Sequence, residues 1–274
     1  WKQVFREQKG IPRNYHEEPV VYGFGAAPQL PDGTPVSYQQ GGVLFLKRYV
    51  YQVYGLAFAL TKVLVEDGDH IRLGQVYARH LAQSLVETKE LLSANVLNTA
   101  FNSAYPGGDG VALFSTAHPL VSGGTNSNTP AVQVDLNETS LEAAVIQIAG
   151  WTDERGLLIA AKPRKLIVPP NLMFVATRLL ETELRVSTNN NDINALKNNG
   201  SIPEGYSVNH FLTDTNGYFL MTDVPNGLKH FVRTPLQNSM DGDFDTGNVR
   251  YKARERYSFG VSDPLGVYGS PGST

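Results

Sequence analysis

After a polar opening segment, residues 1–18, the chain alternates between apolar and polar positions. The stretch "PVVYGFG" places Val20, Tyr22 and Phe24 on one face, and residues 43–61, "VLFLKRYVYQVYGLAFALT", are rich in the residue types that strands prefer. Pro31, Asp32 and Gly33 supply turn chemistry between these two stretches. The pattern predicts a polar arm followed by a long two-stranded ribbon over residues 19–62.

The predicted ribbon leaves a row of apolar side chains without cover. Two strands are marginally stable alone, and Leu56, Phe58 and Leu60 share one face. The covering surface is either the body of the same chain, the commoner arrangement for a hairpin, or a second copy. The strands are joined by roughly 18 residues rich in Gly, Pro and Gln, which suits a projecting tip. We therefore treat Leu56, Phe58 and Leu60 as candidate intersubunit contacts.

The hydrophobic period changes to that of a helix from about residue 69. Apolar residues then recur at helical spacing over residues 69–104, and Asp69 can cap the start. A helix of about 34 residues is roughly 50 Å long, which makes it a strut. Further along, a second helix begins at Asn137 or Thr139, and the Asn216-Gly217 pair predicts a hairpin.

The last predicted strand alternates charge with apolarity, so its basic residues share one face. These basic residues are Arg250, Lys252, Arg254 and Arg256. Three surroundings fit them: nucleic acid, carboxylates of a neighbouring subunit such as Glu17 and Glu18, or solvent. The row of charges does not by itself select among the three.

Composition narrows the function classes. The chain has 274 residues, a formal net charge of -3 and no cysteine, which excludes disulfides, zinc knuckles and thiol nucleophiles. Only 18% of the residues are charged, which suits a surface covered in part by other chains. No apolar run reaches the roughly 18 to 20 residues of a membrane span, so we expect no membrane association.

Two stretches resemble sites of chemistry. Ser115 and His118 lie three residues apart in a glycine-rich segment, but no G-x-S-x-G elbow accompanies them, so we interpret His118 as a loop anchor bonded to backbone carbonyls. Residues 241–247, "DGDFDTG", begin like a calcium loop, yet Thr246 replaces the glycine and Lys252 the bidentate glutamate. We predict no catalytic residue, no cofactor and no metal ion.

The order of these parts is informative as a whole. Together with "ANVLNTAFNSAYPGGDGVALFSTAHPL", "KLIVPPNL" and a closing "RERYSFGVSDPLGVYGSPG", it resembles the major capsid (head) proteins of tailed bacteriophages. The fold of that family was first seen in the Hong Kong 97 phage, and the Mu-type major head subunit is the nearest look-alike. The resemblance runs along essentially the whole chain.

The resemblance implies an α+β fold divided as in that family. The parts are an N-terminal arm (1–18), an extended hairpin called the E-loop (19–62), a peripheral domain (63–150, with its spine helix at about 69–104), an axial domain (151–235) and a peripheral C-terminal strand (236–274). Some relatives crosslink an E-loop lysine. Lys47 and Lys62 lie in this ribbon, but neither matches a motif for that reaction, so we do not extend it to this chain.

The resemblance also implies a non-enzymatic function. We expect hexamers and pentamers of this chain in an icosahedral virion capsid around double-stranded DNA, bound without sequence specificity and assembled in the host bacterial cytoplasm. Portal and decoration proteins are further candidate partners. Two alternatives stay open: an encapsulin-like shell around protein cargo, and a serine hydrolase that uses Ser115 and His118.

Overall fold

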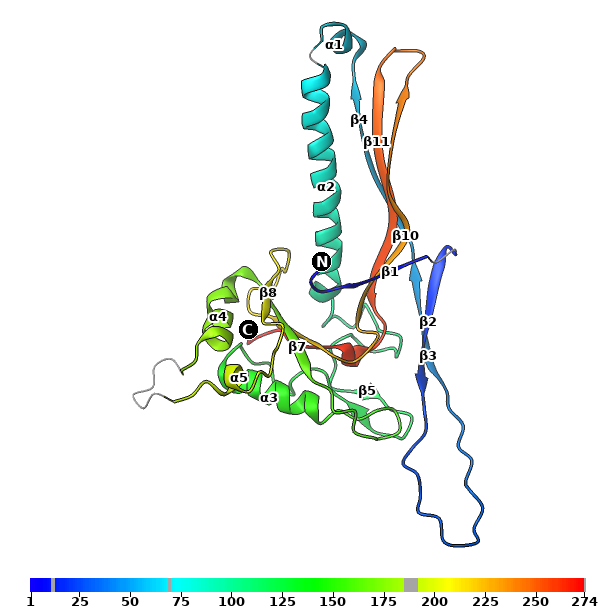
Figure 1. Ribbon diagram of the computed structural model, residues 1–274, viewed down its shortest axis with the longest axis vertical. Coiled ribbons are helices and arrows are strands. Elements are labelled where there is room, and N and C mark those ends of the chain that lie inside the picture. The colour runs from blue at the N-terminus through cyan, green and yellow to red at the C-terminus, as the bar shows by residue number, and fades with distance from the viewer. Residues whose placement is uncertain (11–12, 69, 185–191, 274) are drawn as a thin grey trace. The chain divides into compact units, whose positions relative to one another are not determined.

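The computed structural model describes residues 1–10, 13–68, 70–184 and 192–273 (Figure 1). The chain divides into two compact units, each assembled from three segments. Unit 1 comprises Trp1–His16, Tyr49–Ser93 and Lys229–Gly260, and unit 2 comprises Glu17–Arg48, Ala94–Leu228 and Val261–Thr274. Residues 94–150, which we expected beside the long helix, therefore group with residues 151–228.

Unit 1 is built on a four-stranded sheet in the order β1 (Arg6–Lys9), β10 (Leu228–Gly242), β11 (Val249–Val261) and β4 (Gln52–Leu60). The short helix α1 (Lys62–Glu66) follows β4, and the long helix α2 (His70–Asn98) returns alongside β4 and β11 (Figure 1). Aromatic contacts join the helix to the sheet, because the ring of Phe58 on β4 lies 5.7 Å from that of Tyr77 on α2.

The long helix has 29 residues and ends at Asn98, six residues before the predicted end. The Asn98 side chain donates to the carbonyl of Phe211 and accepts from the amide of Thr213, each at 3.0 Å. Asparagine favours such bonds over helix continuation, and residues 99–101 form turns instead. The proposed cap Asp69 lies outside the described residues.

The prediction of one ribbon strand over residues 43–61 is wrong in its second half. Residues 42–50 form β3, which pairs with β2 (Tyr15–Tyr22), whereas residues 52–60 form β4 and pair antiparallel with β11. Continuous alternation does not show where a strand changes partner, because both pairings keep the same two-residue period.

The same chain therefore covers much of the face that we assigned to a second copy. Leu60 is 3% exposed, and the Phe58 ring stacks on Tyr251 at 5.0 Å. Leu56, on the same face of β4, is 49% exposed. The expectation that this row needs another subunit is wrong for Leu60, and it stays a proposal for Leu56 and Phe58.

Unit 2 contains a second four-stranded sheet in the order β12 (Val267–Ser270), β9 (Tyr218–Thr222), β7 (Pro163–Val168) and β8 (Tyr206–Val208). It is accompanied by the α-helices α3 (Glu138–Ala149), α4 (Met173–Glu181) and α5 (Ala195–Asn198) and by the short 3-10 helices η1 (Pro170–Leu172) and η2 (Pro264–Gly266). Its core includes the fully buried side chains of Leu141, Ile148, Leu166, Tyr218 and Leu220. A small two-strand sheet, β5 (His118–Pro119) with β6 (Thr125–Asn126), carries the candidate site.

Local signals in unit 2 were informative for one element and misleading for another. Asn137 caps α3 through a reciprocal capping box with Ser140, which confirms the first of the two predicted starts. The predicted hairpin about Asn216-Gly217 is wrong, because β7 lies between β8 and β9 in the sheet. Asn216 instead sits in a turn in which its amide donates to the Asp214 carboxylate at 2.9 Å.

Candidate functional sites

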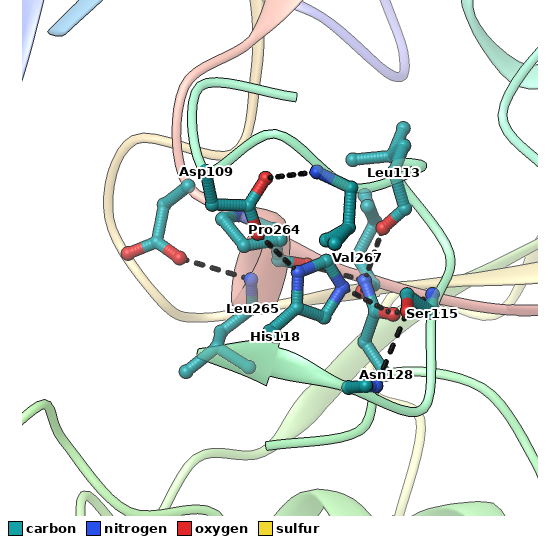
Figure 2. Close-up of polar contacts among 11 residues, drawn as sticks. Asp109, Leu113, Ser115, His118, Asn128, Pro264, Leu265 and Val267 are labelled. Atoms are coloured by element: carbon teal, nitrogen blue, oxygen red, sulfur yellow. Dashed lines mark hydrogen bonds and ion pairs between the residues drawn. The ribbon is translucent and has the colours of Figure 1, made fainter. Parts of the chain in front are cut away.

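His118 lies at the centre of a buried polar network in unit 2 (Figure 2). Its ring is 5% exposed; Nδ1 lies 2.5 Å from Oδ2 of Asp109, and Nε2 lies 3.0 Å from Oδ1 of Asn128. The residue does anchor a loop, but the predicted bonds to backbone carbonyls are wrong, since both partners are side chains. Sequence spacing gave no sign of either partner.

Asn128 is the hub of this network, and its side chain is fully buried. Its Nδ2 donates to the carbonyls of Leu113 at 2.7 Å and Pro264 at 2.9 Å, and more weakly to that of Val267 at 3.3 Å. Its Oδ1 accepts from the amide of Ser115 at 3.0 Å. One amide thus joins the segment around residue 113 to the C-terminal segment.

The bonds of Asn128 also determine where the protons of His118 lie. Because Nδ2 of Asn128 faces carbonyls, its Oδ1 is the acceptor, and Nε2 of His118 must carry a hydrogen. Nδ1 of His118 and the Asp109 carboxylate then share one further proton across 2.5 Å. The imidazole has no lone pair directed at a serine.

Ser115 is not placed as a nucleophile. Its Oγ accepts from the amide of Ala117 at 3.1 Å, and its backbone amide is held by Asn128. A nucleophilic serine needs a base within hydrogen-bond reach, and both ring nitrogens of His118 are bonded to other groups. The geometry is that of a structural brace.

Two further carboxyl groups lie near this network. Burial raises the pKa of Asp263 to about 6, although its carboxylate accepts from the amide of Leu265 at 2.9 Å. Burial also raises the pKa of Glu154, whose Oε2 is buried without a hydrogen-bond partner among the described residues. No three His, Cys, Asp or Glu residues in the described ranges form a group that could hold a metal ion.

The basic row of β11 lies on the face of the unit 1 sheet opposite the apolar side chains. Arg250, Lys252 and Arg254 are exposed and Arg256 is half-buried, while Ala253, Glu255 and Tyr257 on the other face are buried. The cross-strand neighbours of the four cations on β4 are small and exposed. They are Ala59, Ala57, Gly55 and Val53, in that order.

Arg250 of the basic row, and the two carboxylates Glu17 and Glu18, have partners within the chain. Arg250 is paired with Asp243 in the β10–β11 turn, where the side chain of Thr246 also donates to Asp243 at 2.6 Å. The calcium-like stretch is thus an acidic turn at the end of the basic row. Glu17 is paired with Arg48 at 2.6 Å, and Glu18 accepts from the hydroxyl of Ser262.

A family model described as phage capsid protein matches residues 48–270 of the chain. The chain belongs to this family. The capsid protein is therefore a structural component of a virion capsid, and the part of its chain that the structure describes has no helix long and apolar enough to cross a bilayer. No curated protein sequence matches it.

Solved structures share the fold of this capsid protein at low identity. The capsid of cyanophage P-SCSP1u is 10% identical with a TM-score of 0.61, covering 97% of this chain and 85% of that one. Gordonia phage Cozz is 11% identical with a TM-score of 0.57 and coverage of 100% and 86%. A virus-like particle from Pyrococcus furiosus is 12% identical with a TM-score of 0.56 and coverage of 98% and 91%. The Hong Kong 97-like α+β fold is confirmed, and the Mu-type resemblance stays a prediction.

Sequence reasoning missed a buried ion pair in unit 1. Nζ of Lys89 lies 2.6 Å from Oε2 of Glu255, whose side chain is 5% exposed, and 4.8 Å from the centre of the Tyr257 ring. Glu255 stands at an apolar position of the alternating strand, and this misplaced charge was a readable signal of a buried partner. Burial, with the nearby Glu255 carboxylate, raises the pKa of Tyr257.

Proposed function

We propose that this capsid protein forms the hexamers and pentamers of an icosahedral phage head that encloses double-stranded DNA and assembles in the bacterial cytoplasm. The family match supports a role in the shell, and one feature supports self-assembly: loop 23–41 exposes apolar side chains that its own chain leaves uncovered. They are Phe24, Leu30, Val36 and Tyr38, which are 60%, 47%, 65% and 98% exposed. A second copy that covers them gains apolar burial and orders the loop.

Assembly of the purified chain tests the proposal. We expect closed shells in electron micrographs and a large species in size-exclusion chromatography. Replacing residues 24–40 with a Gly-Ser linker of equal length should leave soluble, folded subunits. A matched control is Val132→Ser, because Val132 is 74% exposed elsewhere in unit 2 and should not affect shell formation. A wild-type chain that stays a folded monomer at every concentration overturns the proposal.

The basic row of β11 is proposed as a contact for an anionic partner, either packaged DNA or carboxylates of another copy. Lys252 and Arg254 are exposed next to small side chains, between Arg250, which is paired with Asp243, and the half-buried Arg256, and they leave room for an extended anion. Changing Lys252 and Arg254 to Gln distinguishes the two partners. DNA contact predicts normal empty shells with a weaker dependence of DNA retention on salt, whereas contact between subunits predicts impaired shell formation without DNA.

An encapsulin-like shell is a second proposal, supported by the similarity to the virus-like particle. The contents of purified particles discriminate between the two. Nuclease-protected DNA supports the phage head, and a stoichiometric protein cargo supports the compartment.

We also propose that the protein has no hydrolase activity, since Ser115 and His118 are bonded to other groups. Wild type and Ser115→Ala should be equally inactive on ester and peptide substrates. Hydrolysis that is lost in the variant would contradict this proposal.

A further inference from the structure

Loop 23–41 has little structure of its own to fix its direction. It joins β2 to β3 without forming a strand, and within it the amide of Gly25 donates to the Gln39 side chain at 2.8 Å. The Thr34 hydroxyl donates to the Pro31 carbonyl at 2.6 Å in a local turn. A loop held only in this way samples many directions, and docking it on another subunit would cost conformational entropy.

Arg155 joins the two ends of this loop. Its Nε donates to the carbonyl of Gly23 at 3.3 Å, and its Nη2 donates to the carbonyl of Gln40 at 3.0 Å. The guanidinium also lies 4.9 Å from the centre of the Tyr22 ring, the last residue of β2. A planar fork with several donors suits this task, because it bonds two separate carbonyls while stacking on an aromatic face.

The backbone that presents Arg155 is itself braced. Asp153 Oδ1 accepts from the amide of Arg155 at 2.9 Å and from that of Leu157 at 2.8 Å. The amide of Asp153 donates to the carbonyl of Leu157 at 2.7 Å, and Gly156 takes a positive φ of 85°. This tight turn follows directly on Trp151, which is buried in the core of unit 2. Arg155 therefore extends from a fixed point of the unit.

A second support lies along β3. Nζ of Lys47 donates to the carbonyl of Pro106 at 2.8 Å, and the Phe45 ring lies so close to Gly108 that a Cβ there would be 2.3 Å from it. The turn beneath these residues carries Asp109, which is bound to His118. The ribbon is thus held by contacts of β3 with the turn at residues 106–110, and Arg155 binds it where loop 23–41 begins and ends.

We propose that Arg155 is a positioning residue that fixes the direction in which loop 23–41 leaves its own subunit. The loop is then already ordered when it meets a second copy. The inference rests on the proposed function, because it assumes that this loop makes a contact between copies. Arg155 thereby determines how readily the contact between copies forms.

The direction of the loop can be measured in the unassembled chain. The protein has no cysteine, so Ser37→Cys in the loop and Ala143→Cys on α3, both exposed, provide the two positions for spin labels. We expect a narrow distance distribution in the otherwise wild-type chain. Arg155→Ala should broaden it clearly, and Arg155→Lys should broaden it in part, because lysine keeps the charge but not the fork.

Assembly then gives the functional readout. The concentration at which shells form should rise about three- to tenfold in Arg155→Ala, with the thermal midpoint of the subunit nearly unchanged. Arg178→Ala, which removes an exposed arginine from α4, is the matched control and should change neither measurement. If Arg155→Ala fails to fold, Arg155→Gln, which keeps a donor and a similar length, takes its place.

Three outcomes overturn the inference: an unchanged distance distribution in Arg155→Ala, an unchanged assembly concentration, or assembly at a lower concentration. The last would mean that Arg155 holds the loop back. Failure of the wild type to assemble overturns the proposed function instead, and the spin-label distances still test whether Arg155 orders the loop.

Discussion

Among the residues whose burial is described, each unit buries one histidine, and the two rings are used in opposite ways. His118 in unit 2 is 4% exposed and bonds to two side chains. His230 in unit 1 is 1% exposed, and neither ring nitrogen has a hydrogen-bond partner among the described residues. Its ring lies 4.4 Å from Phe259 in a stacked arrangement and 4.3 Å from Trp1 edge to face.

The surroundings explain the difference. Burial, then the nearby Lys89, lowers the pKa of His230 to about 3, so the ring is neutral and packs as an aromatic disc. His118 instead bonds the buried Asp109 carboxylate at one ring nitrogen and the buried side-chain oxygen of Asn128 at the other. Burial alone therefore does not reveal the role of a histidine, because its partners decide it.

The largest expected effect comes from removing the hub of the His118 network. Asn128→Leu should lower the free energy of unfolding of unit 2 by about 3 to 5 kcal/mol, because several buried donors and acceptors lose their partner together. Denaturant unfolding, followed by the fluorescence of Trp151 in a Trp1→Phe background, measures this loss. The control is Asn199→Leu at an exposed position, and a loss below about 1 kcal/mol would show that the network is dispensable.

Replacing each histidine with phenylalanine tests the comparison directly. His118→Phe should cost about 2 to 4 kcal/mol at pH 7, because it leaves the buried Asp109 carboxylate without its partner. His230→Phe should change stability by less than about 1 kcal/mol, since it removes no hydrogen bond among the described residues. Equal losses of stability in the two variants would show that the two histidines do not differ in role.

A pH titration tests whether the buried His230 ring is neutral. Its pKa in the folded chain, about 3, lies below the ordinary value of 6.5, so the unfolded state binds a proton first as pH falls. Unit 1 should therefore lose stability between pH 6.5 and pH 3, and His230→Phe should flatten this limb. Fluorescence of Trp1 in a Trp151→Phe background follows unit 1, and an unchanged slope in the variant contradicts the assignment.

Asp263 predicts a smaller effect of opposite sign in unit 2. Its pKa in the folded chain, about 6, lies above the ordinary 3.8, so the folded state binds the proton first. Stability from this group is present below pH 3.8 and is lost as pH rises through 6. Asp263→Asn, which still accepts from Leu265, should stabilise unit 2 by about 1 to 2 kcal/mol at pH 7 and little at pH 4. Destabilisation at both pH values would refute this.

The smallest effect concerns the exposed charges. Lys252→Gln should leave the unfolding transition of unit 1 within experimental error, because exposed charges contribute little to the stability of a fold. A thermal scan checks it, and a large loss would show that the basic row is structural.

Sequence reasoning was reliable where one element carries its own pattern. The long helix, the cap of α3 and the alternation of β11 each follow from residues within the element. It failed where the partner was distant: alternation continues through Tyr51 although the strand changes sheets there, and nothing local separates β8 from β9.

The His118 site shows the same limit. The pair of Ser115 and His118 was visible, but the residue that matters most is Asn128, ten positions from the histidine and joined to Pro264 and Val267. Arg155 gave no signal beyond a turn-forming "DERG". Bonds that close over a hundred positions leave no local period, so only the folded chain reveals them.

The turn at residues 106–110 gives the ribbon an unusual foundation. On one side it meets Phe45 and Lys47, and on the other it offers Asp109 to the buried histidine. A ribbon attached in this way at β3 is as rigid there as the interior that holds it, and more rigid than a surface loop. Tension applied to its far end would be transmitted through this turn to the buried His118 network.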